Sequence, residues 1–104
     1  MQTIFISGKI TGDENYKKKF WDTKRELQKR FDEWCVISPT DINLANTEYE
    51  ECLDITKKII EHCDMIFMLK DWVDSHGAII EHNYAMQLHK NIVYQLEEER
   101  ENYV

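Results

Sequence analysis

The chain has 104 residues, which fits a single domain spanning residues 1–104, and its 13 basic and 20 acidic side chains give a net charge of −7. This acidic balance argues against DNA or RNA as a partner, because binding to a phosphate backbone depends on clustered lysine and arginine side chains. The longest strongly apolar run, residues 65–69, is far shorter than the roughly 20 residues that cross a bilayer. With no signal segment at its start, the chain is expected to be cytoplasmic and to have no membrane partner.

Four short apolar runs predict β-strands. They are residues 3–7 (TIFIS), 34–37 (WCVI), 65–69 (MIFML) and 91–94 (NIVY). Each run is apolar on both faces, which is typical of strands in a parallel sheet that is covered on both sides. Predicted helices lie between them, at about residues 15–31, 47–63 and 77–89. This alternation predicts an α/β fold with a small doubly wound parallel sheet of four to five strands.

The predicted helix over residues 47–63 has the clearest helical period. The residues that recur on one face are Tyr49, Cys52, Leu53, Thr56, Ile59, Ile60 and Cys63. Thr56 is therefore expected on the buried face. The acidic segment from Leu96 to Val104 is expected to be a frayed terminal helix or a solvated tail.

Ligands of doubly wound sheets bind beyond the carboxyl ends of the strands, which directs attention to three connecting segments. These are Ser7–Asp13, Ser38–Asn46 and Lys70–Gly77. The first contains two glycines and two hydroxyls in the run Ser7, Gly8, Lys9, Ile10, Thr11, Gly12, where backbone N–H groups can face an anion or a sugar. It is not a Walker A loop, since Thr3 stands in place of the first glycine and Ile10 follows the lysine. A plain turn between strand and helix is the alternative, although Lys9 makes an anionic ligand plausible.

Glu81 lies on the predicted helix over residues 77–89 and shares a mainly apolar face with small side chains such as Gly77, Ala78 and Ala85. Carboxylates are rarely buried without a reason, and the nearby helix start is expected to help keep this one ionised. Such a group beside a cleft could act as a nucleophile or stabilise a cationic transition state. The alternative is a surface glutamate that merely complements the helix dipole.

The remaining polar residues give weaker signals. Asp71, Trp72 and Asp74 are of types that usually serve solubility and packing, although Trp72 could form a stacking wall for a planar base. The histidines and the three cysteines match no common metal-ligand spacing, and no HExxH is present. We therefore expect reduced thiols, no metal and no cofactor.

Two separated motifs resemble a known family. Residues 4–12 (IFISGKITG) resemble the YISGPITG opening of a bacterial and phage domain of unknown function, and residues 63–82 (CDMIFMLKDWVDSHGAIIEH) resemble its CDaiyLLpgWedSkGAxxEh signature. The resemblance covers about residues 3–94. That family is similar to the nucleoside 2-deoxyribosyltransferases and the 2'-deoxynucleoside 5'-phosphate N-hydrolases, which share a small flavodoxin-like (Rossmann-like) fold and cleave the N-glycosidic bond of deoxynucleosides.

The resemblance implies roles for individual residues. Glu81 aligns with the family's catalytic nucleophile, Ser75 and Gly77 with groups that contact a 5'-phosphate, and residues 8–12 with a loop that lines the sugar and base pocket. Ser7, Asp71 and Trp72 flank these positions and complete the predicted substrate-binding set. The implied ligand is a small deoxynucleoside or nucleotide, and the implied assembly is a homodimer.

Two departures keep a second interpretation open. The resembled enzymes place a tyrosine where this chain has Phe5, and an aspartate where it has Thr56. Loss of polar groups from a pocket can cost a large part of the catalytic rate without abolishing binding. The predicted function is therefore cleavage or transfer at the N-glycosidic bond of a 2'-deoxynucleoside or its 5'-monophosphate. The alternatives are a nucleotide-binding sensor or sequestering protein with weak or no catalysis, and an interaction module without a ligand.

Overall fold

A computed structural model describes residues 1–42 and 47–96 of the chain. Its four strands are β1 (Thr3–Ser7), β2 (Cys35–Ile37), β3 (Met65–Met68) and β4 (Asn91–Tyr94). They form an all-parallel sheet in the order β2-β1-β3-β4, with β1 paired to both β2 and β3. The predicted α/β class with a doubly wound parallel sheet is confirmed, with four strands in the part of the chain that is described.

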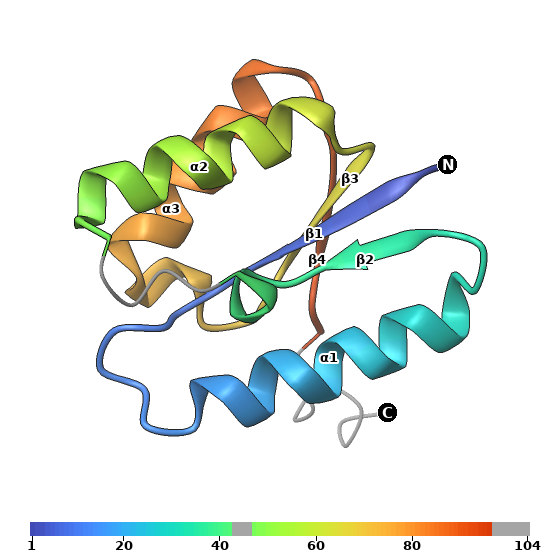
Figure 1. Cartoon of the computed structure of the whole chain (residues 1–104), viewed down its shortest axis with the longest axis horizontal. Helices are drawn as coiled ribbons and strands as arrows, with labels where there is room; N and C mark the ends of the chain where they lie inside the picture. Colours follow the sequence, from blue (N-terminus) through green and yellow to red (C-terminus); the bar gives the residue numbers. More distant parts are fainter. Residues whose placement is uncertain (43–46, 97–104) are drawn as a thin grey trace.

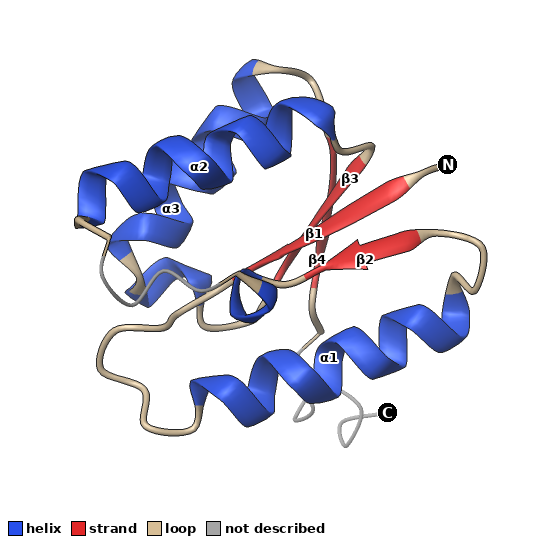
Figure 2. Cartoon of the chain, in the orientation of Figure 1, coloured by secondary structure: helices blue, strands red, loops and turns tan. Residues whose placement is uncertain are grey.

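In the described part of the chain, three α-helices cover the sheet (Figures 1 and 2). They are α1 (Tyr16–Arg30), α2 (Tyr49–His62) and α3 (His76–Gln87). Helix α1 lies on one face of the sheet, and α2 and α3 lie together on the other. The predicted helices overlap all three, with ends that differ by one or two residues. Two predicted segments lie partly outside the described residues. They are the loop Ser38–Asn46, at residues 43–46, and the acidic tail, at residues 97–104.

Alternating side chains of β1 divide the core into two layers. Ile4 and Ile6 pack on the α1 side with Phe20 and Leu27, whereas Phe5 packs on the side of α2 and α3. All three β1 side chains are fully buried, as the period of two along a strand requires when both faces are covered. The central strand β1 therefore matches the predicted pattern.

Strand β4 corrects one prediction. Its sequence NIVY was expected to be covered on both faces, yet Val93 and Tyr94 are 39% and 48% exposed. The cause is topological, because β4 lies at the edge of the sheet and pairs only with β3. Ile92 alone in this strand packs against the core on the side of α2 and α3.

The order of the strands positions the site. The chain passes from β1 to β2 on one side and then returns across β1 to β3, so the connections diverge between β1 and β3. Parallel α/β sheets bind ligands at this switch point, outside the carboxyl ends of the strands. In the described residues, no helix is long and apolar enough to cross a membrane. Cys35, Cys52 and Cys63 are free thiols.

Candidate functional site

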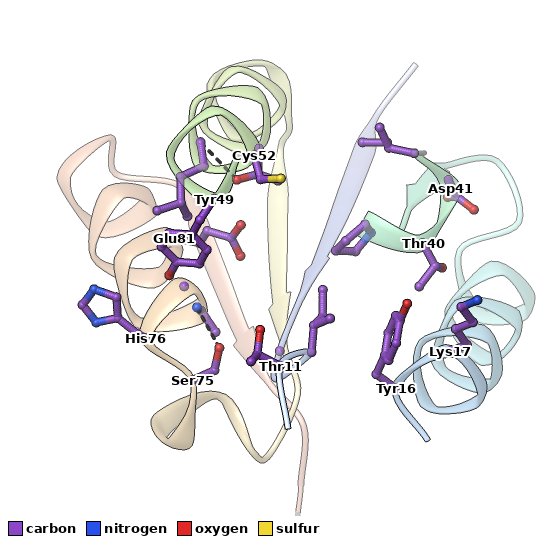
Figure 3. A pocket seen from close by; sticks show the side chains of 18 of the residues that line it. Thr11, Tyr16, Lys17, Thr40, Asp41, Tyr49, Cys52, Ser75, His76 and Glu81 are labelled. Atoms are coloured by element: carbon purple, nitrogen blue, oxygen red, sulfur yellow. Dashed lines mark hydrogen bonds between the residues drawn. The ribbon is translucent and has the colours of Figure 1, made fainter. Parts of the chain in front are cut away.

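A cavity of about 1450 Å³ opens at the carboxyl ends of β1, β2 and β3. The connections that follow the three strands and the first turns of the helices line it. The labelled side chains of Figure 3 place Tyr49, Cys52, Ser75, His76 and Glu81 on the wall made by α2 and α3, and Tyr16, Lys17, Thr40 and Asp41 on the opposite wall. Thr11 lies between the two walls.

Glu81 is the buried charged group of this cavity. It lies in the second turn of α3 and is only 7% exposed, yet it lines the cavity. The Ser7 hydroxyl, at the end of β1, donates a hydrogen bond of 2.7 Å to Glu81 Oε1. Ser7 is itself fully buried, so its side chain serves the carboxylate rather than the solvent. The alternative of a surface glutamate is therefore wrong.

Burial raises the pKa of Glu81, and hydrogen bonding to the hydroxyls of Ser7 and Thr56 lowers it in part. The buried Thr56 hydroxyl also donates to the carbonyl oxygen of Leu53 at 3.2 Å. The helix start has a smaller role than predicted. Glu81 lies beyond the first turn of α3, where the favourable effect of the helix dipole fades, and the two hydroxyls supply the stabilisation of the anion instead.

The N-terminus of α3 forms the next part of the same wall. Ser75 caps the helix, with its Oγ accepting a hydrogen bond of 3.2 Å from the backbone N–H of Ala78. A Cβ atom at Gly77 would lie 3.2 Å from the Tyr49 hydroxyl, so the glycine leaves room for that phenol. The Tyr49 ring stacks on His76 with 6.4 Å between ring centroids. Partial burial, followed by the charge of Glu81, raises the pKa of the Tyr49 hydroxyl.

The loop after β1 contributes Gly8, Ile10 and Thr11 to the cavity. Gly8 is required by packing, since a Cβ atom there would lie 2.5 Å from a Leu69 side-chain carbon. Gly12 has φ +85°, the left-handed region that favours glycine, and turns the chain back towards α1. Lys9 and Gly12 of the same loop do not line the cavity.

The family of the chain follows from its sequence. A family model described as a domain of unknown function, DUF4406, matches residues 2–94. The chain belongs to this family. No curated protein matches it.

Two solved structures share the fold of this DUF4406 domain. A 2-deoxyribosyltransferase from Leishmania mexicana superposes with a TM-score of 0.69 at 24% identity, covering 90% of this chain and 63% of that one. A CMP N-glycosidase from Clostridium botulinum gives a TM-score of 0.63 at 21% identity, covering 99% and 75%. The DUF4406 chain thus spans less than two thirds of the transferase. The predicted similarity to the nucleoside 2-deoxyribosyltransferase superfamily is confirmed as a similarity of fold.

Five residues of the predicted binding set lie outside the cavity lining of the DUF4406 chain: Ser7, Lys9, Gly12, Asp71 and Trp72. Asp71 accepts a hydrogen bond from the backbone of Lys9 and forms an ion pair with Lys19. Trp72 stacks on the His82 ring with 4.1 Å between centroids, and Tyr94 lies beside both rings. The His82 ring therefore covers one face of Trp72, and Trp72 does not line the cavity in which a base would bind.

Sequence reasoning also missed part of the wall. The additional lining residues are Tyr16, Lys17, Lys18 and Trp21 of α1, and Tyr49, Cys52 and Leu53 of α2. Pro39 to Ile42 also line the cavity, and they fall within the segment Ser38–Asn46 that the sequence had indicated. Trp21 is 58% exposed, and a large aromatic side chain on the polar face of a helix was the available signal. In the described ranges, no three histidine, cysteine, aspartate or glutamate side chains gather closely enough to hold a metal ion.

Proposed function

We propose that this protein cleaves or transfers at the N-glycosidic bond of a 2'-deoxynucleoside or its 5'-monophosphate, with Glu81 as the nucleophile. One observation carries the proposal: a carboxylate that is 7% exposed nevertheless lines the cavity and is held by the Ser7 hydroxyl. A buried carboxylate costs free energy unless it is paired, and this one is paired with hydroxyls rather than with a cation. Its negative charge is thus left available to a substrate. The likeness in fold to two enzymes of this chemistry supports the same conclusion.

The chemistry fits a carboxylate in this position. As the bond between C1' and the base nitrogen breaks, its electron pair leaves with the base and positive charge develops on the sugar. The ionised Glu81 stabilises that charge and forms an ester bond to C1'. Water, or the nitrogen of a second base, then attacks C1' and releases the carboxylate. The base that leaves takes up a proton, and the water that attacks gives one up, so the hydrolytic cycle is balanced.

The N-terminus of α3 suits the 5' side of such a substrate. Gly77 precedes Glu81 by four residues, which is one helical turn or about 6 Å along the axis. Backbone N–H groups at a helix start favour anions, and Ser75 and the Tyr49 hydroxyl stand beside them. A 5'-phosphate held there would leave C1' of the sugar within reach of Glu81. Gly8, Ile10 and Thr11 would then line the sugar and base.

Base release is the direct test. The wild-type protein is incubated with each deoxynucleoside and each 5'-monophosphate, and free base is measured by chromatography. We expect release from at least one of them, and loss of that release in Glu81→Ala. Glu26→Gln, a change on the exposed face of α1, is the matched control and should release base like the wild type. Equal release by the wild type and Glu81→Ala would contradict the role of Glu81.

A second function is favoured by two observations. Phe5 stands where the resembled enzymes have a tyrosine, and it is fully buried in the core between the sheet and the helices α2 and α3. Thr56 lines the cavity where they have an aspartate. Thr56 makes the lining less polar than an aspartate would, and the Phe5 side chain offers no hydroxyl to Glu81. A protein that binds a nucleotide without cleaving it needs neither polar group. Calorimetric binding of a nucleotide without base release would identify this case.

Assembly as a homodimer remains a prediction from the family resemblance. Light scattering of the purified protein measures it directly. A mass near twice the 12.6 kDa of the chain is the expected result, and a monomer would remove this part of the proposal.

A further inference from the structure

Lys19 of α1 joins the two loops that follow β1 and β3. Its ammonium group donates to the carbonyl oxygen of Lys9 at 2.8 Å and to one carboxylate oxygen each of Asp13 and Asp71, both at 2.5 Å. An ammonium has three protons, so these three acceptors occupy all of them. Only 23% of the Lys19 side chain is exposed, which limits the screening of its ion pairs by solvent.

The two carboxylates extend this connection along the loop after β1. Asp71 uses its other oxygen to accept the backbone N–H of Lys9 at 3.0 Å, so the main chain at Lys9 is held on both sides. Asp13 accepts the backbone N–H of Asn15 at 2.9 Å, and its own N–H donates to the carbonyl of Ile10 at 3.1 Å. The hydrogen bond from Lys19 lowers the pKa of Asp13. The loop is therefore anchored at Lys9 and again at Asp13.

Ile10 and Thr11 lie between these anchors, and both line the cavity. The position of this wall thus depends on contacts that lie outside the cavity. We propose that Lys19 is a positioning residue for the proposed reaction, holding Ile10 and Thr11 where they contact the substrate. This inference rests on the proposed function. It also gives Asp71 a role, as the second half of the same connection rather than as a ligand of the substrate.

Removal of the ammonium would leave Asp13 and Asp71 without their shared counter-charge, and two like charges at short range repel each other. The loop would then separate from the connection after β3. Glu81 lies outside this network, because its hydrogen bond comes from Ser7, whose carbonyl is fixed to the backbone N–H of Leu69 at 2.8 Å. Loss of Lys19 should therefore weaken substrate binding more than it slows the chemical step.

Hydrogen exchange tests the positioning without reference to activity. Amide exchange is followed by mass spectrometry in the wild type, in Lys19→Met and in Lys29→Met, a change of the same kind at an exposed position of α1. We expect exchange over residues 8–13 to be at least tenfold faster in Lys19→Met only, with α3 unchanged. Asp71→Asn should loosen the same residues without altering α1. Unchanged exchange over residues 8–13 in both Lys19→Met and Asp71→Asn would overturn the proposal.

Kinetics separates positioning from a general structural role. With the 5'-monophosphate that the wild type cleaves fastest, Lys19→Met should raise KM about tenfold and change kcat less than threefold. Lys19→Arg, which keeps the charge and several donors, should recover part of the lost affinity. A fall in kcat with KM unchanged would overturn the proposal. A wild type that releases no base from any substrate would refute the proposed function alone, and the exchange measurement would still decide on Lys19.

Discussion

Glu81 and His82 are neighbours on α3, and both are polar and buried, yet their surroundings differ. The His82 ring is enclosed by Trp72, and its two nitrogens lie 3.1 Å from Asn83 Oδ1 and 2.6 Å from the Tyr94 hydroxyl. Glu81 instead borders a cavity and is held by hydroxyl groups. A buried polar group whose partners are all supplied by the protein stabilises the fold, whereas one that keeps a side open to a cavity is available for chemistry.

The largest difference between substitutions of Glu81 and of His82 is expected in catalytic activity. Glu81→Gln keeps the size of the side chain and removes the nucleophile, so base release should fall by at least about 10³-fold. His82→Ala should leave kcat for the folded protein within threefold of the wild type. The measurement is steady-state release of base, at a temperature where each variant is folded. Comparable losses in the two variants would show that the two residues do not differ in the way described.

The free energy of unfolding should change in the opposite order, with the larger loss in the His82 variant. His82→Ala removes a stacked ring and leaves the Tyr94 hydroxyl without its partner, so the free energy of unfolding should fall by about 2 kcal/mol or more. Urea denaturation followed by circular dichroism measures this change. Gln87→Ala, an exposed change on the same helix, should alter stability much less. An unaltered stability in His82→Ala would refute the structural role of the aromatic cluster.

Ser7→Ala should lower activity at neutral pH by about 10- to 100-fold, the usual effect of losing a hydrogen bond to a charged group. Ser7 lowers the pKa of Glu81, so its removal should raise that pKa and move the acid limb of the profile of kcat against pH to higher pH. The loss should therefore shrink as the pH is raised. A loss of the same size at every pH would mean that Ser7 does not act through the ionisation of Glu81.

The smallest expected effect is on the pH dependence of stability. Burial raises the pKa of Glu81 in the folded chain, so above the usual value of 4.5 the folded state holds a proton that the unfolded state has lost. The free energy of unfolding should consequently decrease as the pH rises from 4.5 through the raised pKa. Glu81→Gln has no such proton and should flatten this slope, making the variant more stable than the wild type at neutral pH. Parallel slopes for the two proteins would contradict the direction of the pKa shift.

Local sequence patterns were sufficient for most of the fold. The apolar runs predicted the strands. The small side chains that share a face with Glu81 left a buried and a surface position open, and the structure shows Ala78 and Ala85 buried on that face together with Glu81. The exposure of β4 was missed because an apolar run does not reveal whether its strand lies at an edge. The hydrogen bond that holds Glu81 comes from Ser7, which is 74 residues away in the sequence, so local patterns could not predict it.

The limits of sequence reasoning are clearest at the cavity walls. Trp72 was expected either to pack or to form a stacking wall for a base, and its packing on His82 and Tyr94 depends on how α3 and β4 meet. Asp71 was included in the predicted substrate-binding set. Its partner in the structure, Lys19, lies 52 residues earlier in the sequence, so the local pattern could not reveal the ion pair. Trp21 of α1 was not considered, since its position on a polar helical face suggests solvent rather than a cavity. Each of these placements depends on a tertiary contact that the local sequence pattern does not show.

The central claim, that Glu81 attacks the sugar, is tested most directly by trapping the covalent intermediate. The protein is mixed with a cleavable deoxynucleoside 5'-monophosphate, quenched in acid and digested, and the peptide that contains residue 81 is examined by mass spectrometry. The account predicts an added deoxyribosyl phosphate on Glu81 in the wild type and none in Glu81→Gln. Continued release of base by Glu81→Gln, with no adduct on residue 81 in either protein, would contradict it.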